Sequence, residues 1–561
     1  MRTFTCITVG VLFDGRRGSV AGEGFDPLRV YVAGGGLLPA GCGWRVALAM
    51  AGMPPVAANF GVGSWIERRA RIAPGRVALV GDDSSFTYAE LAGRVRRLAN
   101  GLQRLGVGHG DRVAWLGPNH PAFLESLFAA GLVGAVLAPV NHRLAVDGIR
   151  AVLADIDPSV LIQHAATGPT PVVDSVGQRI AVAGRIEGAL EFDALVVESS
   201  DDPVEVAVGM DDLCLLPHTS GTTGSPKGVM LTHANLTWNV INFLSCADFR
   251  GDDVTVAIAP FFRVGGTGVN VLPVLFLGGT VVVPNDLSPA GILQVMERHR
   301  VTVGFGNPDL LDALTRSQAW PQVDLSSVRF VVTGGAPVPE RLIRAWLNRG
   351  VMLLQGYGLS EAAPLALLLD PTSALAKMGS AGRPPLLVDI QIVHPDGTVV
   401  GPGETGELVV RGPNVMAGYW RRPEATQEVL SADGWLRTGD AARRDQEGYV
   451  WIVDRVADCF VSDGRPVYPG DVERVLSGHP AVADAGVVQV PTRVGGEVAA
   501  IVVLAPAADA TKEEILAFGR QHLAAHQAPV SVTFVDRLPR NSVGKLLRAQ
   551  LHVLLPPANP T

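Results

Sequence analysis

The amino-acid sequence predicts an α/β fold with two parts: a large N-terminal domain of several subdomains, in which sheets and helices form layers, and a small α+β C-terminal domain. The chain has 561 residues, which is too many for a single hydrophobic core. Over most of its length, apolar β-branched runs, glycine-rich loops and helical segments alternate, and this alternation is typical of sheets covered by helices. After about residue 380 the pattern changes to short strands separated by turns.

The first regular element that the sequence predicts is a helix over FTYAELAGRVRRLANGLQRLGV, where Thr87 and Glu90 have the spacing of a capping box. Its apolar face comprises Leu91, Val95, Leu98, Leu102 and Leu105. The stretch DRVAWLGPN predicts a strand and a turn. The apolar stretch SLFAAGLVGAVLAPV (Ser126 to Val140) is shorter than the ~20 residues that span a bilayer, so it predicts a buried helix.

Three later segments share one plan, in which an apolar run is followed by a glycine-rich loop and a helix. They are VTVGFGNPDLLDAL, VRFVVTGGAPVPERLIRAW and VMLLQGYGLSEAAP. In α/β folds, ligands bind at the loops beyond the carboxyl ends of the strands. These loops are therefore the predicted place of a binding site.

The two ends of the chain differ from this central pattern. Towards the C-terminus, Asp396-Gly397 and Glu447-Gly448 mark hairpins, AVADAGVVQV and EVAAIVVLA predict strands, and TKEEILAFGRQHLAAH predicts a helix. The first 52 residues show no sustained period. We expect residues 1–52 to be an unstructured or wrongly assigned extension, with Met53 as the start of the regular chain.

The composition argues against several classes of function. A net charge of −8 with 18% charged residues is unlike that of a nucleic-acid-binding protein. The five cysteines are scattered and lack C-x-x-C spacing, which favours reduced thiols in a cytoplasmic protein over disulfides or a zinc site. No transmembrane segment is expected, and contact with a membrane surface stays open. Neither H-E-x-x-H nor G-x-S-x-G occurs, so zinc-peptidase and serine-hydrolase functions lack support.

The stretch HTSGTTGSPKGVMLTH, from His218 to His233, indicates a phosphate-binding loop. The chain has four lysines, at 227, 377, 512 and 545, among 46 basic residues. Since arginine supplies nearly all of the positive charge, we expect Lys227 to be used for its compact point charge. Backbone amides of a glycine-rich turn and the hydroxyls beside them can bind phosphate. The stretch is not a Walker A loop, because Pro226 precedes the lysine. The two flanking histidines are interpreted as packing or capping residues.

The segment TSGTTGSPKG resembles the phosphate-loop signature of the adenylate-forming enzymes, the superfamily of acyl-CoA synthetases, luciferases and peptide-synthetase adenylation domains. Further motifs match that superfamily in the same order: GYGLSE (356–361), GELVVRGP (406–413), TGD (438–440), DRVAD (454–458) and PRNSVGK (539–545). The resemblance covers roughly Met53 to Leu551. The chain is most similar to bacterial fatty-acyl-CoA synthetases, the long- and medium-chain fatty-acid–CoA ligases.

This resemblance implies a domain organisation and an activity. The expected parts are an ATP- and acid-binding domain (53–454), a hinge (455–458) and a small mobile domain (459–556) that carries the adenylation lysine. The implied activity is that of an ATP- and Mg²⁺-dependent ligase, which converts a fatty or related hydrophobic acid to an acyl-adenylate and transfers the acyl group to CoA. Alternatives are an aromatic-acid CoA ligase, an enzyme that passes the acyl group to a carrier protein, and a catalytically weak acyl-binding protein.

The resemblance also implies roles for individual residues. Ser360 would contact the α-phosphate, Glu361 would bind the magnesium ion, and Lys545 would bridge the carboxylate and the α-phosphate. Asp440 would take the ribose hydroxyls, supported by Arg455. The other implied ATP-binding residues are Thr219, Ser220, Gly221, Thr222, Thr223, Gly224, Lys227, Gly335, Ala336, Gly356, Tyr357 and Gly358. The implied acyl pocket or gate comprises Arg263, Val264, Gly265 and Gly334.

Three positions depart from the pattern of the superfamily. Relatives usually carry histidine where this chain has Arg263, and aspartate or lysine at the hinge position of Ala457. In the implied CoA loop, SDGRPVYP (462–469) stands for a sequence close to SGGENIYP, so that Asp463 replaces a glycine before Gly464. Because CoA is itself anionic, the sequence predicts ordinary adenylation followed by a slow thioester step or by a different acceptor.

Overall fold

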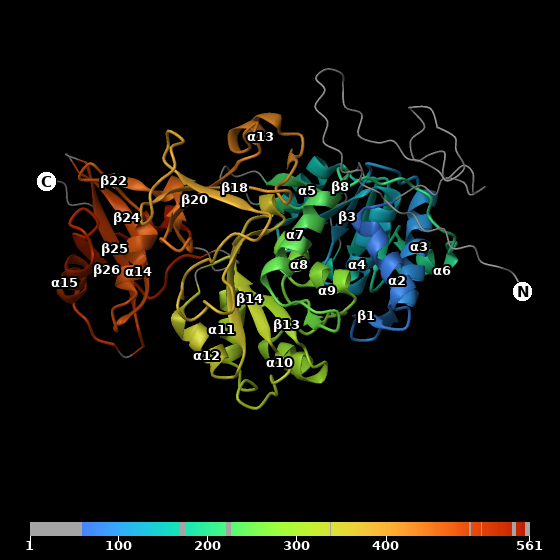
Figure 1. Ribbon diagram of the computed structural model, residues 1–561, viewed down its shortest axis with the longest axis horizontal. Helices are drawn as coiled ribbons and strands as arrows, with labels where there is room; N and C mark the ends of the chain where they lie inside the picture. Colours follow the sequence, from blue (N-terminus) through green and yellow to red (C-terminus); the bar gives the residue numbers. More distant parts are fainter. Residues whose placement is uncertain are drawn as a thin grey trace, which may run out of the picture. The chain divides into compact units, whose positions relative to one another are not determined.

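Figure 1 shows the computed structural model of the chain. It describes residues 59–168, 176–219, 226–336, 338–492, 495–506, 508–540 and 546–555. The predicted extension over 1–52, the loop residues Ser220 to Gly224 and the predicted adenylation residue Lys545 lie outside the described residues.

Within the described residues, the largest sheet has nine strands and a parallel centre. Its order is β19 (Gly418–Tyr419), β10 (Lys227–Thr232), β8 (Leu213–Leu215), β4 (Val136–Val140), β3 (Arg112–Leu116), β5 (Val160–His164), β6 (Gln178–Val182) and β7 (Leu190–Glu191), with β9 (His218–Thr219) paired to β10. Strand β10 is antiparallel to β8, β9 and β19. The predicted phosphate hairpin therefore lies at one edge of this sheet, beside residues 418–419.

The second sheet has eight strands among the described residues and is parallel except at its two ends. Its order is β16 (Leu365–Leu368), β15 (Met352–Gly358), β14 (Phe330–Gly334), β13 (Val303–Gly306), β11 (Val254–Val256), β12 (Thr280–Val282), β1 (Val77–Val80) and β2 (Ser85–Thr87). The carboxyl ends of β13, β14 and β15 thus lie side by side.

Helices cover both sheets. They are α2 (Trp65–Ile72), α3 (Tyr88–Arg104), α4 (Pro121–Val133), α5 (Val146–Ile156), α6 (Phe192–Glu198), α7 (His233–Cys246), α8 (Val264–Gly268), α9 (Val271–Leu277), α10 (Pro289–Arg298), α11 (Pro308–Thr315), α12 (Glu340–Leu347) and α13 (Pro423–Val429). The main hydrophobic core joins residues of both sheets to residues of α3, α4, α7 and α9, so these helices pack between the sheets. Every residue of α4 is buried, which explains its largely apolar sequence, and its one charged residue, Glu125, pairs with Arg94 at 2.7 Å.

The remaining strands form smaller units. An antiparallel sheet contains β17 (Asp389–Val393), β18 (Gly406–Arg411), β20 (Leu436–Arg444) and β21 (Val450–Arg455). The C-terminal elements are β22 (Phe460–Ser462), β23 (Arg465–Val467), α14 (Pro469–Leu476), β24 (Val482–Thr492), β25 (Gly495–Leu504), α15 (Lys512–His522) and β26 (Ser531–Phe534). These C-terminal elements have hydrophobic clusters of their own. Short 3-10 turns span Val62–Ser64, Ala165–Thr167, Ser360–Ala362, Val456–Asp458 and Arg548–Leu554.

The predicted two-part α/β architecture is confirmed. Helix α3 has the expected capping box, in which the Thr87 hydroxyl accepts from Glu90 N and the Glu90 carboxylate accepts from Thr87 N. Both predicted hairpin turns lie between strands or bridged residues, at Asp396-Gly397 and Glu447-Gly448.

Two local predictions are wrong. The stretch from Ser126 to Val140 is not one helix, because α4 ends at Val133, Gly134 adopts a left-handed conformation with φ +73°, and β4 follows. Only glycine enters that conformation at little cost, and it ends the helix. After β15, where a helix is predicted, the chain forms only the 3-10 turn Ser360–Ala362 and then β16, because Leu365–Leu368 pairs antiparallel with β15.

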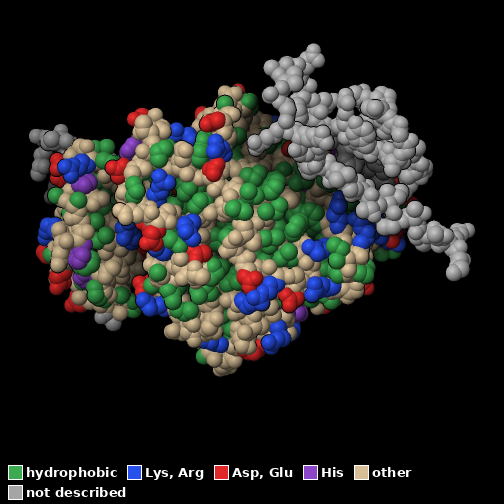
Figure 2. All heavy atoms as spheres, in the orientation of Figure 1, with side chains coloured by type: hydrophobic (Ala, Val, Ile, Leu, Met, Phe, Trp, Pro, Cys, Tyr) green, Lys and Arg blue, Asp and Glu red, His purple; other side chains and the backbone are tan. Residues whose placement is uncertain are grey.

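Charges of both signs are mixed on the face that Figure 2 shows, where Lys and Arg side chains lie among Asp and Glu. Among the residues that the structure describes, none of the helices combines the length and the apolar character that crossing a membrane requires.

Candidate active site

The base of the predicted phosphate loop is a short hairpin. Strands β9 and β10 pair Thr219 with Lys227 and His218 with Gly228. The ammonium of Lys227 lies 5.1 Å from the centroid of the Tyr419 ring, a cation–π distance. The hairpin therefore fixes the backbone position of Lys227, and an aromatic face receives its side chain.

Tyr419 connects Lys227 to the predicted magnesium ligand. Strand β19 pairs Tyr419 with Val229, and the Tyr419 hydroxyl donates to Glu361 Oε1 at 2.7 Å. Burial, and then the charge of Glu361, raise the pKa of Tyr419 above its ordinary value, so the phenol remains a donor at neutral pH. The Lys227 ammonium, the Tyr419 phenol and the Glu361 carboxylate are thus linked in sequence by two contacts.

The backbone around Glu361 is also held from this side. Ser360 and Glu361 lie in the 3-10 turn after β15, and Met416 N donates to the Glu361 carbonyl at 2.8 Å. The structure thus brings Lys227 and Glu361, which are 134 residues apart in the sequence, to a common neighbour. Tyr419 was not among the predicted site residues.

Asp440 and Arg455 meet as predicted from their motifs. They are cross-strand partners in the β20–β21 hairpin, and Arg455 Nε lies 2.8 Å from Asp440 Oδ1. The Tyr357 hydroxyl donates to Asp440 Oδ2 at 2.5 Å, and Asp440 N donates to the Thr438 hydroxyl at 3.1 Å. Burial, and then the charge of Asp440, raise the pKa of Tyr357 well above its ordinary value. The side chain of Asp440 is only 11% exposed, so its orientation is set by these donors.

The glycines at the ends of β14 and β15 allow close approach of the two backbones. A Cβ on Gly334 would lie 2.5 Å from the carbonyl oxygen of Gly356. Gly335 follows with φ +86°, in the left-handed region that favours glycine. With Ala336 and Gly358, these predicted residues line the carboxyl edge where α/β folds bind ligands.

The predicted acyl gate lies at the start of α8. Arg263 precedes the helix, and Val264 and Gly265 form its first turn. A Cβ on Gly265 would lie 3.4 Å from the ring of Phe305, which belongs to β13. Desolvation, and then the neighbouring Arg143 guanidinium, lower the pKa of Arg263. The gate residues therefore lie beside the carboxyl edge of the second sheet.

The structure gives a local explanation for one departure, Asp463 in the predicted CoA loop. Asp463 (φ +53°) and Gly464 (φ +71°) form the turn of the β22–β23 hairpin, in which Ser462 pairs with Arg465. Two consecutive positive φ angles are typical of a type I′ hairpin turn, and Asp-Gly is one of its preferred sequences. Asp463 therefore fits its backbone conformation. Ala457 lies exposed in the 3-10 turn Val456–Asp458.

Beside the Arg455–Asp440 pair, Arg548 makes further charged contacts around the predicted hinge, and sequence reasoning missed it. Its guanidinium contacts Asp454 Oδ2 at 3.1 Å, Asp458 Oδ2 at 3.4 Å and the Glu473 carboxylate. Arg548 follows the predicted adenylation lysine by three residues. The segment after that lysine is thus linked to residues before, within and after the predicted hinge (455–458).

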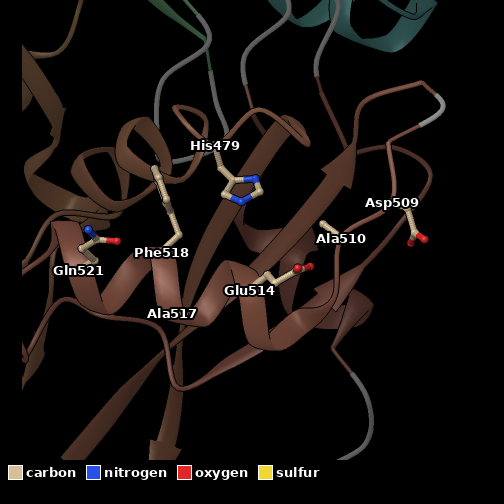
Figure 3. Close-up of a pocket in the computed structure, with 7 residues that line it drawn as sticks. All are labelled: His479, Asp509, Ala510, Glu514, Ala517, Phe518 and Gln521. Atoms are coloured by element: carbon tan, nitrogen blue, oxygen red, sulfur yellow. The ribbon is translucent and has the colours of Figure 1, made fainter.

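One surface cavity lies apart from all of these residues. It is a hollow of about 340 Å³ in the C-terminal elements. Figure 3 shows the residues that line it, which are His479, Asp509, Ala510, Glu514, Ala517, Phe518 and Gln521. None of these residues is a predicted site residue. Among the described residues, no group of three or more His, Cys, Asp or Glu side chains is arranged to hold a metal ion.

Residues 66–420 match the AMP-binding enzyme family. The chain belongs to that family. Residues 471–545 match the AMP-binding enzyme C-terminal domain. The chain is 46% identical over 495 residues to feruloyl-CoA synthase from Amycolatopsis sp, covering 88% of this chain and 99% of that protein. It is 37% identical to indoleacetate–CoA ligase from Aromatoleum aromaticum, covering 88% and 97%.

A solved structure shows the same fold. The fatty acyl CoA synthetase of Mycobacterium tuberculosis superposes with a TM-score of 0.73 and 31% identity, over 88% of this chain and 97% of that one. This member of the AMP-binding enzyme family is an acid–thiol ligase: it activates a carboxylic acid on ATP as an acyl-adenylate and transfers the acyl group to CoA.

Proposed function

We propose that this ligase activates an aromatic acid, of the hydroxycinnamic or arylacetic kind, in preference to a fatty acid. The observation that carries the proposal is the 46% identity to feruloyl-CoA synthase across 99% of that protein, against 31% to the fatty acyl CoA synthetase. The sequence alone placed the fatty acid first and the aromatic acid as an alternative. We now reverse that order.

The predicted roles of the phosphate-side residues are part of the proposal. Lys227 and the loop before it would bind the β- and γ-phosphates, and Ser360 would bind the α-phosphate. Magnesium usually keeps several waters and is bound through one or two carboxylates together with substrate phosphates. Glu361 fits this pattern, because it is a single carboxylate with one oxygen hydrogen-bonded to Tyr419 and no metal cluster around it in the described residues. We therefore propose that Mg²⁺ arrives with ATP, neutralises phosphate charge, and is held by Glu361.

The nucleoside and acid sides follow the same reasoning. Asp440 would accept the ribose hydroxyls, and Arg455 and Tyr357 would keep its carboxylate oriented. A Cβ on Gly265 would lie 3.4 Å from the Phe305 ring, and we propose that a flat acid binds beside this ring, where it can stack on it or meet it edge to face. Lys545 would bridge the carboxylate and the α-phosphate during adenylation.

The domain limits and the location remain proposals as well. We propose an ATP- and acid-binding domain over 53–454, a hinge over 455–458 and a C-terminal domain over 459–556. The separate hydrophobic clusters of the C-terminal elements support this division. We also propose that the enzyme works in the cytoplasm, where ATP and CoA are available. The described cysteines at 214, 246 and 459 are free thiols, in keeping with that location.

The test is pyrophosphate exchange over a panel of hydroxycinnamic, indoleacetic, benzoic and medium- to long-chain fatty acids, followed by CoA addition. We expect the highest kcat/KM with an aromatic acid and conversion of that acid to its CoA thioester. A higher kcat/KM for a fatty acid would overturn the proposed acid class. AMP release without a CoA thioester would favour the carrier-protein alternative, and absence of exchange with every acid would favour the acyl-binding alternative.

A further inference from the structure

Asp155, the penultimate residue of α5, connects two segments that carry predicted site residues. Its Oδ2 lies 3.1 Å from His218 Nε2, and its Oδ1 accepts from Arg422 Nη2 at 2.7 Å. Its backbone carbonyl accepts from Trp420 Nε1 at 3.1 Å. One residue outside every sequence motif discussed above therefore receives three donors from two distant parts of the chain.

The first of these parts is the phosphate hairpin. His218 immediately precedes Thr219, and its backbone pairs with Gly228, directly after Lys227. A Cβ on Gly228 would lie 3.1 Å from the His218 ring, so that ring packs closely against the hairpin backbone. Contact with Asp155 thus anchors the hairpin at the base of the loop.

The second part is the segment 419–422. Trp420 N donates to the Gly228 carbonyl at 2.8 Å, and Tyr419 contacts both Lys227 and Glu361. Two residues of this segment bind Asp155: Trp420, which directly follows Tyr419, and Arg422, which lies three residues after it. Asp155 therefore holds the strand that brings Tyr419 to the lysine and to the carboxylate.

The contact between Asp155 and His218 is buried. The side chains of His218 and Asp155 are 5% and 14% exposed. Burial would raise the pKa of Asp155, but the hydrogen bonds from His218 and Arg422 outweigh it and lower that pKa, so the carboxylate stays charged. Within the described residues, His218 Nδ1 is buried without a hydrogen-bond partner. Such an atom costs free energy that a phenyl ring would avoid, so packing alone does not account for a histidine here.

We propose that Asp155 and His218 are positioning residues for adenylation. They hold Lys227 and Tyr419 at fixed positions relative to each other, so that the ATP phosphates bound by Lys227 lie at a fixed distance from the Glu361 carboxylate. The inference rests on the phosphate-binding roles proposed above, but not on the class of acid. Neither residue touches a reacting atom. Their effect passes through the hairpin and through strand β19.

The chain contains a matched control. His109 and Asp212 form a second His–Asp pair, with His109 Nε2 3.0 Å from Asp212 Oδ2 and side chains that are 50% and 32% exposed. This pair has a similar Nε2–Oδ2 distance to the buried one but is more exposed, and neither residue is assigned to the site. His109→Phe removes a His–Asp contact at a place where no reactant is proposed to bind.

The test compares Asp155→Asn, His218→Phe, His218→Gln and His109→Phe with the wild type. ATP affinity is measured without any acid, pyrophosphate exchange with the acid that the wild type uses best, and thioester formation from supplied acyl-adenylate. A displacement of about 1 Å can cost of the order of 100-fold in rate. We expect Asp155→Asn and His218→Phe to lose about 10- to 100-fold in exchange kcat/KM, mainly through KM for ATP. Thioester formation should change less than about twofold, since it does not use the γ-phosphate contacts.

His218→Gln keeps a donor that can reach Asp155 and should recover most of the loss, and His109→Phe should match the wild type in all three assays. Equal losses in exchange and thioester formation would overturn the inference and show a purely structural role. Unchanged ATP affinity and exchange in both Asp155→Asn and His218→Phe would also overturn it. If instead the wild type prefers a fatty acid while these variants still lose ATP affinity, the proposed acid class fails and the positioning role stands.

Discussion

Replacing Tyr419 by Phe separates the two contacts of this side chain. The substitution keeps the ring that faces the Lys227 ammonium and removes only the hydroxyl that donates to Glu361 at 2.7 Å. A hydrogen bond to a charged group contributes ~1.5–3 kcal/mol, and we take the lower end because Glu361 is only partly buried. Since ~1.4 kcal/mol is a factor of ten in rate, we expect kcat for pyrophosphate exchange to fall about tenfold.

Tyr419→Leu removes the ring as well. A cation–π contact contributes ~0.5–1 kcal/mol at a partly exposed site, so we expect a further loss of about threefold, seen mainly in KM for ATP. The two substitutions therefore predict different kinetic signatures, kcat for the hydroxyl and KM for the ring. Both are read from initial rates of pyrophosphate exchange over a series of ATP and Mg²⁺ concentrations.

Tyr449 provides the control for general destabilisation. Its hydroxyl donates to Asp370 Oδ2 at 2.9 Å, and its ring lies 4.9 Å from the Lys377 ammonium, so it makes the same two kinds of contact away from the proposed site. Tyr449→Phe should lower Tm and leave exchange unchanged. Wild-type exchange in Tyr419→Phe, or equal rate losses in Tyr419→Phe and Tyr449→Phe, would refute the reasoning.

Three further predictions concern the C-terminal residues and pH. Lys545→Ala should abolish adenylation but leave thioester formation from supplied acyl-adenylate largely intact, and equal loss of both half-reactions would contradict separate use of the two faces of the small domain. Ala457→Asp combined with Asp463→Gly should raise the rate of the thioester half-reaction and leave the rate of pyrophosphate exchange nearly unchanged, as measured by stopped flow. If the thioester step of the wild type is already faster than adenylation, the premise that these two positions slow it is wrong. Burial lowers the pKa of His233 to about 4, below the ~6.5 of an unfolded histidine. As pH falls, the unfolded state therefore binds a proton that the folded state does not. The contribution of His233 to the free energy of unfolding should be constant above pH ~6.5 and decline by up to ~1.4 kcal/mol per pH unit towards pH 4. Urea unfolding over this pH range measures the decline.

Sequence reasoning succeeded where the relevant contacts are local. The capping box of Thr87 and Glu90 spans three residues. The turn at Glu447-Gly448 is predicted from its residues, and the hairpin that it closes makes Asp440 and Arg455 cross-strand partners, although their association was implied only by the resemblance to the superfamily. Within such short spans, the periods of strands and helices and the chemistry of turns decide the outcome.

The missed residues act over long sequence distances. Tyr419 reaches Glu361 across 58 residues, and Arg422 reaches Asp155 across 267. Both contacts depend on β19 pairing with β10 at the sheet edge, and a two-residue strand has no period from which it could be predicted. The composition gave one signal for Tyr419: the chain has only six tyrosines, so each tyrosine is a candidate for a specific role. The prediction for Ser126 to Val140 failed for another reason: a buried helix and a buried parallel strand are both largely apolar, and only Gly134 and Ala135 lie between them.

The contacts of Arg548 limit where this chain can be joined to a relative when domains are exchanged. The Arg548 side chain is 18% exposed, and its single guanidinium contacts the carboxylates of Asp454, Asp458 and Glu473. A chimera joined at Ala457 would take Asp454 from one parent and the arginine from the other, and a mismatch would leave a buried carboxylate without its counter-ion, which destabilises proteins strongly. A junction placed before Asp454 transfers all four groups as a unit. For the same reason these four positions are expected to change together, rather than singly, as the sequence diverges.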